Sequence, residues 1–226
     1  MVAISHAHRF VFIKTHKTAS TTVDMFLEPF CAPEGHRPER YCDALETEHG
    51  IIGARGPKLD GQFWRAHMGA PKIRTGLAGG QFDAYTKLTT IRNPFARAVS
   101  KFLFRRRYQD LPTLTDLTEI RTAFCAFLMG DNYRSDYFKV HLNHRYIIDI
   151  ALRFEHLKSD LMAACVRLGL DPARSVLGHE NDNRAATTAR PTADYYADPA
   201  TIARVHEVDA WMFDHHGYAD RPQVAA

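Results

Sequence analysis

The sequence lacks the features that mark zinc-bound, disulfide-framed, secreted or membrane-spanning chains. Its four cysteines form no CxxC pair and no zinc-type spacing. Residues 1–9 include two histidines and an arginine, unlike a secretory signal. No apolar run approaches the ~20 residues of a membrane span. We therefore expect a reduced, cytoplasmic protein without a transmembrane segment. Cys125 and Cys165 are predicted to be buried thiols. Cys31 and Cys42 are expected to be reduced, and a disulfide bond between them is the alternative.

The sequence also has no strong excess of charge of one sign. It carries 29 Lys and Arg against 26 Asp and Glu, a net charge of +3 at pH 7. That is too little for a dedicated nucleic-acid binder, although it is compatible with a local basic site. A composition of 45% hydrophobic and 24% charged residues is typical of a folded protein. We expect one domain over residues 1–226, large enough to bury a substantial core.

Short strand-like runs alternate with helical patterns along the chain. Strands are predicted at Phe10–Ile13, Phe63–Met68, Tyr85–Ile91 and Tyr146–Phe154. Helices are predicted at residues 20–30, 95–105, 115–129, 156–168 and 198–215. Residues 31–62 are rich in glycine, proline and charge, which favours a surface loop with at most a short helix. The alternation predicts an α/β fold with a mostly parallel sheet and helices on both faces.

A loop dense in hydroxyls and cations follows the first predicted strand and precedes a helix. Backbone N–H groups at a helix N-terminus carry partial positive charge and bind anions. The candidate ligands of a phosphate or sulfate group are Lys14, Lys17, Thr18, Ala19, Ser20, Thr21 and Thr22. The segment lacks the glycines of a Walker A loop. The alternative interpretation is a basic surface loop with a good helix cap.

A second polar group follows the strand that ends at Ile91. Arg92 lies at the carboxyl end of that strand, where open α/β sheets bind ligands. Ser100 lies about two turns into the next helix, and a guanidinium with a hydroxyl can hold a second anionic group. The alternative is an arginine that caps a strand and a serine that faces a neighbouring helix. Two anion sites at one sheet edge suggest one ligand with phosphates at both ends.

These two motifs resemble those of the PAPS-dependent sulfotransferases. Residues 17–22, Lys-Thr-Ala-Ser-Thr-Thr, resemble the 5′-phosphosulfate loop, and Arg92-Asn-Pro…Arg97…Ser100 resembles the 3′-phosphate element. The carbohydrate branch is the most similar, in particular the heparan 2-O-sulfotransferase type in a short bacterial form. Further familial landmarks are residues 153–155, Asp209, Phe213, Gly217 and Tyr218. The chain departs from the family at His16, where a proline commonly precedes the loop lysine.

The resemblance implies roles for individual residues. Lys17 would contact the 5′-phosphosulfate and stabilise the bridging oxygen as the S–O bond breaks. The 5′-phosphate would be bound by Thr18, Ser20, Thr21 and Thr22. Arg92 and Ser100 would bind the 3′-phosphate. A late loop closes over the nucleotide in the family, and here it would bring Arg184 to a phosphate.

Sulfuryl transfer to an alcohol needs a proton acceptor within hydrogen-bond reach of the hydroxyl. His67, at the end of a predicted strand, resembles the base of the 2-O-sulfotransferase branch. Because the chain has 13 histidines, a structural role is the alternative. The reserve candidates are Glu46, Glu48 and His49.

No metal is expected to take part. A sulfuryl group carries less negative charge than a phosphoryl group, so Lys17 and backbone N–H groups can suffice. No clear Walker B run is present. His141-x-x-His144 and His215-His216 lack the further ligands of a closed metal site, which favours structural or surface roles. The basic run 105–107 is interpreted as a solvated helix end, with attraction of an anionic glycan as the alternative.

Together these features predict a P-loop-like α/β fold, a parallel sheet flanked by helices on both faces. The expected activity is sulfuryl transfer from PAPS to a hydroxyl of an acceptor, a carbohydrate or glycoconjugate by branch resemblance, with release of PAP. Two alternatives stay open: a P-loop small-molecule kinase that uses ATP and Mg²⁺, and a non-catalytic module that binds PAP or another nucleotide. Trp64 and Trp211 are assigned to the core.

Overall fold

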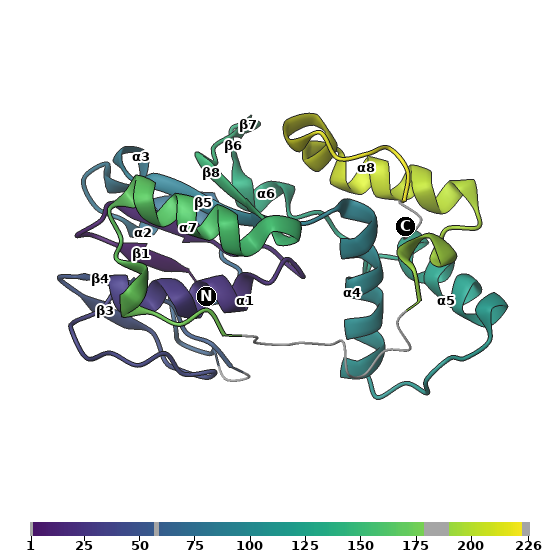
Figure 1. Ribbon diagram of the computed structural model, residues 1–226, viewed down its shortest axis with the longest axis horizontal. Coiled ribbons are helices and arrows are strands. Elements are labelled where there is room, and N and C mark those ends of the chain that lie inside the picture. The colour runs from purple at the N-terminus through teal and green to yellow at the C-terminus, as the bar shows by residue number, and fades with distance from the viewer. Residues whose placement is uncertain (1, 57–58, 179–189, 223–226) are drawn as a thin grey trace. The chain divides into compact units, whose positions relative to one another are not determined.

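The computed structural model describes residues 2–56, 59–178 and 190–222. The chain forms two compact units, here called the first and second unit (Figure 1). The first unit comprises Met1–Ile91 with Phe138–Asn181, and the second comprises Arg92–Tyr137 with Asp182–Ala226. The assignment of residues 1–226 to a single sulfotransferase domain stays a prediction.

A six-stranded sheet forms the centre of the first unit, with the order β3-β4-β1-β2-β5-β8. The strands are β1 (Ala3–Ser5), β2 (Phe10–Ile13), β3 (Leu45–Thr47), β4 (Gly50–Ile52), β5 (Thr86–Ile91) and β8 (Ile150–Arg153). β2, β5 and β8 pair in parallel, so their carboxyl ends share one sheet edge. β1, β3 and β4 extend the sheet by antiparallel pairing. The α/β prediction is confirmed. The loop after β2 begins at the end of a strand in the parallel part of the sheet.

Helices and short 3₁₀ turns flank this sheet. They are α1 (Ser20–Leu27), η1 (Glu28–Phe30), α2 (Ala70–Gly76), α3 (Gln81–Ala84), α6 (Tyr137–Val140), η2 (Phe154–His156), α7 (Leu157–Leu168) and η3 (Pro172–Arg174). α1 and α7 share one hydrophobic core with the sheet: Val23 and Phe26 of α1 and Leu161 of α7 cluster with Phe10 and Phe12 of β2. β2 is buried along its whole length, as its apolar sequence predicts. The helix predicted for residues 20–30 changes to a 3₁₀ turn at Glu28, because Pro29 cannot donate the next helical hydrogen bond.

The strand predicted at Phe63–Met68 is wrong. Only Arg65 pairs there, in an isolated bridge with Ala54. The backbone leaves the extended region at His67, whose φ is 60°. The segment is therefore a turn that ends before α2, and it is this turn that positions the candidate base.

The loop predicted over residues 31–62 contains a hairpin, β3 with β4. Its tight approach to β1 depends on Gly50, where a Cβ atom would lie 2.1 Å from the Ile4 carbonyl oxygen. The strand predicted at Tyr146–Phe154 is also wrong in extent. Its first residue belongs to β7 (Arg145–Tyr146), which forms a separate hairpin with β6 (His141–Leu142).

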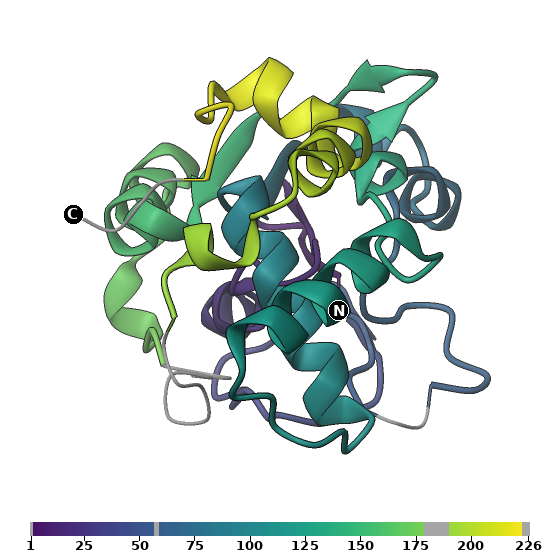
Figure 2. The ribbon, with the colours of Figure 1, turned by 90° about the vertical axis from the view of Figure 1, so that its right-hand side faces the viewer.

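The second unit is helical, with α4 (Pro94–Tyr108), α5 (Leu117–Met129), η5 (Thr192–Tyr195) and α8 (Pro199–His216). Figure 2 shows these helices packed on one another. Phe95 and Phe102 of α4 form a core with Phe124 of α5 and Val205 of α8. α5 begins where the sequence predicts, since the Asp116 carboxylate accepts a hydrogen bond from the Glu119 N–H at 2.9 Å.

Buried side chains follow most of the sequence expectations. Trp64 and Trp211 are buried, as predicted. Cys165 is buried, whereas Cys125 is only partly so. Among the residues described here, no helix is both long and apolar enough to cross a lipid bilayer.

Candidate active site at the loop after β2

Residues 14–19, here called the anion loop, join β2 to the N-terminus of α1. The strand–loop–helix order is the predicted one. Lys17 and Ala19 both adopt the left-handed region, with φ of 62° and 59°. Alternation of left- and right-handed residues turns successive N–H groups toward one concavity, which suits an anion. Left-handed backbone at non-glycine residues costs of order 1 kcal/mol each, and such strain gathers at functional loops.

Hydroxyl groups join the anion loop to β5 and fix the shape of the loop itself. The Thr15 hydroxyl donates to the Thr90 carbonyl at 2.6 Å, and the Thr18 hydroxyl lies 2.7 Å from that of Thr90. Thr15 and Thr18 are also 2.9 Å apart through their hydroxyls, and Ser20 donates to the Thr15 carbonyl at 2.6 Å. The side chains of Thr18 and Ser20 therefore shape the loop from inside. At the N-terminus of α1, these residues can therefore bind an anion through their backbone N–H groups.

Lys14 is the first residue of the anion loop, and its side chain lies in a buried cluster of charges. Its ammonium is 3.4 Å from the Asp24 carboxylate, and the Arg55 guanidinium is 3.5 Å from the same oxygen. Arg55 also pairs with the buried Glu28. Burial lowers the pKa of Lys14, while Asp24 raises it and Arg55 lowers it further. The structure thus places Lys14 against Asp24, in support of the loop. Lys17 is partly exposed on the loop itself.

The candidate base, His67, reaches the first residue of the anion loop. Its Nδ1 lies 3.4 Å from the Lys14 carbonyl oxygen. A carbonyl oxygen can only accept, so Nδ1 carries the proton and Nε2 is the nitrogen that can accept one. Burial lowers the pKa of His67 well below its ordinary value, and the neighbouring His16, Lys139 and Lys14 lower it further. His67 is therefore a neutral imidazole near pH 7, with its Nε2 free of a proton.

The reserve candidates lie elsewhere in the first unit. Glu46 is on β3, where its carboxylate accepts a hydrogen bond from the Trp64 indole at 3.0 Å. Glu48 and His49 form a solvent-exposed pair at 3.7 Å in the β3–β4 turn. His67 is the candidate that contacts the anion loop by a hydrogen bond.

No protein-family model matches the chain, and no curated protein matches it. A solved sulfotransferase is similar in structure. It comes from Alicyclobacillus acidocaldarius, is 16% identical, and aligns over 88% of this chain and 94% of its own with a TM-score of 0.36. At that identity and TM-score, the likeness carries no inference about activity.

The second predicted anion group, Arg92 and Ser100, belongs to the second unit. Arg92 follows the last residue of β5, and Ser100 lies in the second turn of α4, as predicted. α4 begins at a cap in which the Asn93 side chain accepts a hydrogen bond from the Ala96 N–H at 3.1 Å. Assignment of Arg92 and Ser100 to a 3′-phosphate rests on their sequence spacing. Arg184 lies outside the described residues.

Arg97, between those two residues, has a role that the sequence did not indicate. It is fully buried and pairs with Asp136, at 3.3 Å, and with Asp209. Asp209 also accepts a hydrogen bond from the Tyr133 hydroxyl at 2.6 Å. Burial alone would lower the pKa of Arg97, but the two carboxylates raise it above its usual range. Arg97 and Asp209, two residues of the familial pattern, are thus a structural pair.

The other polar features have local roles. Arg106, in the basic run, donates to the Pro112 carbonyl at 2.5 Å and stacks its guanidinium over the Phe102 ring. Cations in the last turn of α4 also complement its dipole. His141, from the His-x-x-His pair, is buried with its ring 5.3 Å from that of Tyr146. The burial of His141 agrees with a structural role for that histidine, whereas the contacts of Arg106 differ from the solvated helix end that the sequence predicts.

Proposed function

We propose that this protein is a sulfotransferase that moves a sulfuryl group from PAPS to an acceptor hydroxyl and releases PAP. One observation carries the proposal: the imidazole of His67 is bonded to the anion loop, in the tautomer that leaves Nε2 able to take a proton. A candidate base and a candidate anion cradle are therefore adjacent in one compact unit. The resemblance of residues 17–22 to the phosphosulfate loop supports the choice of PAPS as the donor.

The proposed step is an in-line displacement at sulfur. The acceptor oxygen forms a bond to sulfur as its proton passes to Nε2 of His67. The bond between sulfur and the bridging oxygen of the 5′-phosphate breaks, and the electron pair stays on that oxygen. The Lys17 ammonium and the N–H groups at the start of α1 stabilise the negative charge that develops there. The sequence resemblance assigns the 3′-phosphate to Arg92 and Ser100.

The proposed acceptor is a carbohydrate hydroxyl, and this choice rests on the resemblance to the carbohydrate branch. The proposal needs no metal ion, because Lys17 and the loop backbone supply the positive charge. A kinase that uses ATP and Mg²⁺, or a module that only binds PAP, would be distinguished by the following measurements.

Calorimetry with PAP in the presence of EDTA, against ADP with Mg²⁺, tests the nucleotide class. We expect tight PAP binding without metal and weak ADP binding. Tighter binding of ADP, dependent on Mg²⁺ and accompanied by ATP turnover, would favour the kinase. Adenosine 5′-phosphate is the matched ligand for the 3′-phosphate site, because it differs from PAP only there. Arg92→Ala should abolish the advantage of PAP over adenosine 5′-phosphate, whereas Arg204→Ala on α8 should keep it.

Transfer itself is measured with radiolabelled PAPS and a panel of glycans. Lys17→Ala should abolish transfer, and near-normal turnover by this variant would overturn the assignment of Lys17. His67→Ala should lower kcat by ~10²-fold or more with PAP affinity unchanged. If His67→Ala loses PAP binding as well, His67 is a structural residue. PAP binding without transfer to any acceptor by the unchanged protein would favour the binding module.

A further inference from the structure

Two side chains distant in sequence surround the candidate base in the first unit. The rings of His16 and His67 are stacked, with centroids 3.9 Å apart and planes 13° from parallel. The Lys139 ammonium lies 2.9 Å from Nδ1 of His16. His16 comes from the anion loop, His67 from the turn before α2, and Lys139 from α6. The base thus stacks on a ring of the anion loop, and that ring is hydrogen-bonded to a side chain of α6.

The hydrogen-bond chemistry fixes the protonation state of His16. An ammonium group has three donors and no acceptor, so Nδ1 of His16 must accept from Lys139. A neutral imidazole that accepts at Nδ1 carries its proton at Nε2. Protonation of His16 would place an N–H against the Lys139 ammonium and a cation against the ring of His67. Lys139 therefore holds His16 in its neutral form.

Backbone packing also brings α6, which carries Lys139, close to the turn that carries His67. Gly69, two residues after His67, lies against α6 so closely that a Cβ atom would be 2.9 Å from the Phe138 carbonyl oxygen. The same Cβ would be 3.4 Å from Cα of Lys139. The approach of α6 to the turn that carries the base is therefore built into the backbone. It does not depend on the flexible lysine side chain alone.

We propose that His16 is a positioning residue for the base: it stacks on His67, and Lys139 holds His16 neutral so that the pair presents a deprotonated His67 to the acceptor. The inference rests on the proposed sulfuryl transfer for its purpose, but its geometry stands without it. His16 occupies the position where the resembling family commonly has proline, so this arrangement belongs to the present chain.

The charges that face His67 agree with this role. Lys14 reaches it from the loop and Lys139 from α6, and both of these cations oppose a positive charge on its ring. When His67 takes the acceptor proton, the new imidazolium lies beside Lys139 and on the neutral His16 ring. Repulsion by the nearby cations then favours release of that proton to solvent. His67 thus returns to the neutral state before the next turnover.

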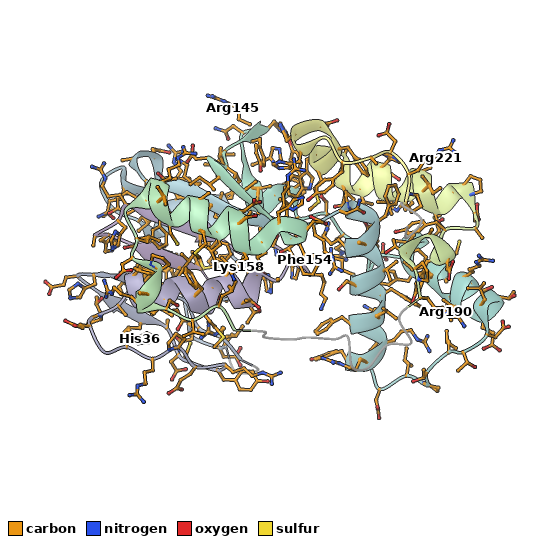
Figure 3. All side chains as sticks on the ribbon, viewed as in Figure 1. His36, Arg145, Phe154, Lys158, Arg190 and Arg221 are labelled. Carbon is orange, nitrogen blue, oxygen red and sulfur yellow. The ribbon has the colours of Figure 1, made fainter. Side chains whose placement is uncertain are left out.

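The first experiment is an NMR titration of the histidine ring resonances, which needs no turnover. In the unchanged protein, His67 should stay neutral through the ordinary histidine range near pH 6.5. Lys139→Met removes the cation and should raise the pKa of His67 by about one unit or more. Lys158→Met is the matched control, because Lys158 is exposed on α7 (Figure 3). An unchanged pKa of His67 in Lys139→Met would overturn the role of Lys139.

The second experiment measures transfer against pH. His16→Ala should lower kcat by about tenfold to a hundredfold with little change in KM for PAPS, because the base loses its orientation. His16→Phe keeps a stacked ring and should recover most of kcat, whereas His156→Phe, at an exposed position, should change nothing. In Lys139→Met the acid limb of the pH–kcat profile should move to higher pH.

The outcomes separate the two proposals. If the titration behaves as expected but no acceptor is sulfated, the proposed function fails and the arrangement of the three side chains stands. If transfer occurs and His16→Ala keeps the full kcat and the same acid limb, the positioning role of His16 is wrong. Loss of folding in His16→Ala is detected by circular dichroism, and His16→Phe then carries the test.

Discussion

The hydroxyl of Thr18 lies 2.7 Å from the hydroxyl of Thr90, and both side chains are completely buried. This contact joins the anion loop to β5, the strand that pairs in parallel with β2. The loop is therefore held at both its origin and its middle. A strained backbone with two left-handed residues needs such fixed points if it is to stay open for an anion.

Thr18→Val should destabilise the protein and weaken nucleotide binding. Valine keeps the shape of the side chain but removes the hydroxyl. The buried hydroxyls of Thr15 and Thr90 then each lose a hydrogen-bond partner. We expect a loss of about 1–3 kcal/mol in the free energy of unfolding, measured by urea denaturation. Thr75→Val, at an exposed position of α2, is the matched control and should stay within about 0.5 kcal/mol. Equal stability and PAP affinity in Thr18→Val would contradict the role given to the hydroxyls.

Asp24→Asn should have a larger effect. Asp24 is fully buried and faces both Lys14 and Arg55, so its loss leaves these two buried cations without the carboxylate that they share. Breaking a buried ion cluster in this way costs about 3–5 kcal/mol.

Asp83→Asn breaks an exposed pair with Arg74 and is the control for charge removal. It should cost less than about 1 kcal/mol. The double variant Asp24→Asn, Lys14→Met should recover part of the loss, because it removes one of the stranded cations. No recovery would mean that Lys14 and Asp24 do not act as a pair.

The sequence predicts the centre of the first unit because the signals there are local. Phe10–Ile13 is an unbroken apolar run and the polar loop follows it directly, so strand, loop and helix are all visible within neighbouring residues. β1, β3 and β4 have three residues each, too few to show a period. The run at Phe63–Met68 has strand-like composition, but a left-handed residue, His67, ends it.

The surroundings of the base could not be predicted, because they depend on distant residues. Lys139 is 123 positions from His16, and no sequence motif links them. Arg97 and Asp209 are likewise 112 positions apart, and the sequence pattern that contains them does not show that they pair. Spacing suggested that Arg97 belonged to an anion motif, whereas burial shows that it holds α4 to α8. A sequence motif therefore shows which residue types are present at a site, but it does not show which of them bind the anion and which stabilise the fold.

Arg97→Met tests that support role. The substitution fills a similar volume but leaves the Asp136 and Asp209 carboxylates buried without their cation. We expect a loss of about 3–5 kcal/mol in the stability of the second unit. Arg97→Lys keeps the charge but has a single ammonium in place of the guanidinium, which can reach both carboxylates. It should therefore lose less of the free energy of unfolding than Arg97→Met, but still be less stable than the unchanged protein. Urea denaturation followed by Trp211 fluorescence, in a Trp64→Phe background, measures both variants, and wild-type stability in Arg97→Met would rule out the ion cluster as a support.

The lowered pKa of His67 has a consequence for stability against pH. In the unfolded chain His67 takes up a proton as the pH falls below its ordinary pKa of 6.5, whereas in the folded protein burial and the neighbouring cations keep it neutral. The unfolded state then binds more protons, so the free energy of unfolding falls as the pH falls below 6.5. His67→Asn removes the titrating group but keeps a donor for the Lys14 carbonyl. Its stability should therefore fall less than that of the unchanged protein on going from pH 7 to about pH 5, as measured by urea denaturation at each pH. His156→Asn, at an exposed position, is the control and should keep the wild-type slope. An equal slope in His67→Asn would mean that the folded protein protonates His67 as readily as the unfolded chain does, and the imidazole could not then serve as a neutral base at low pH.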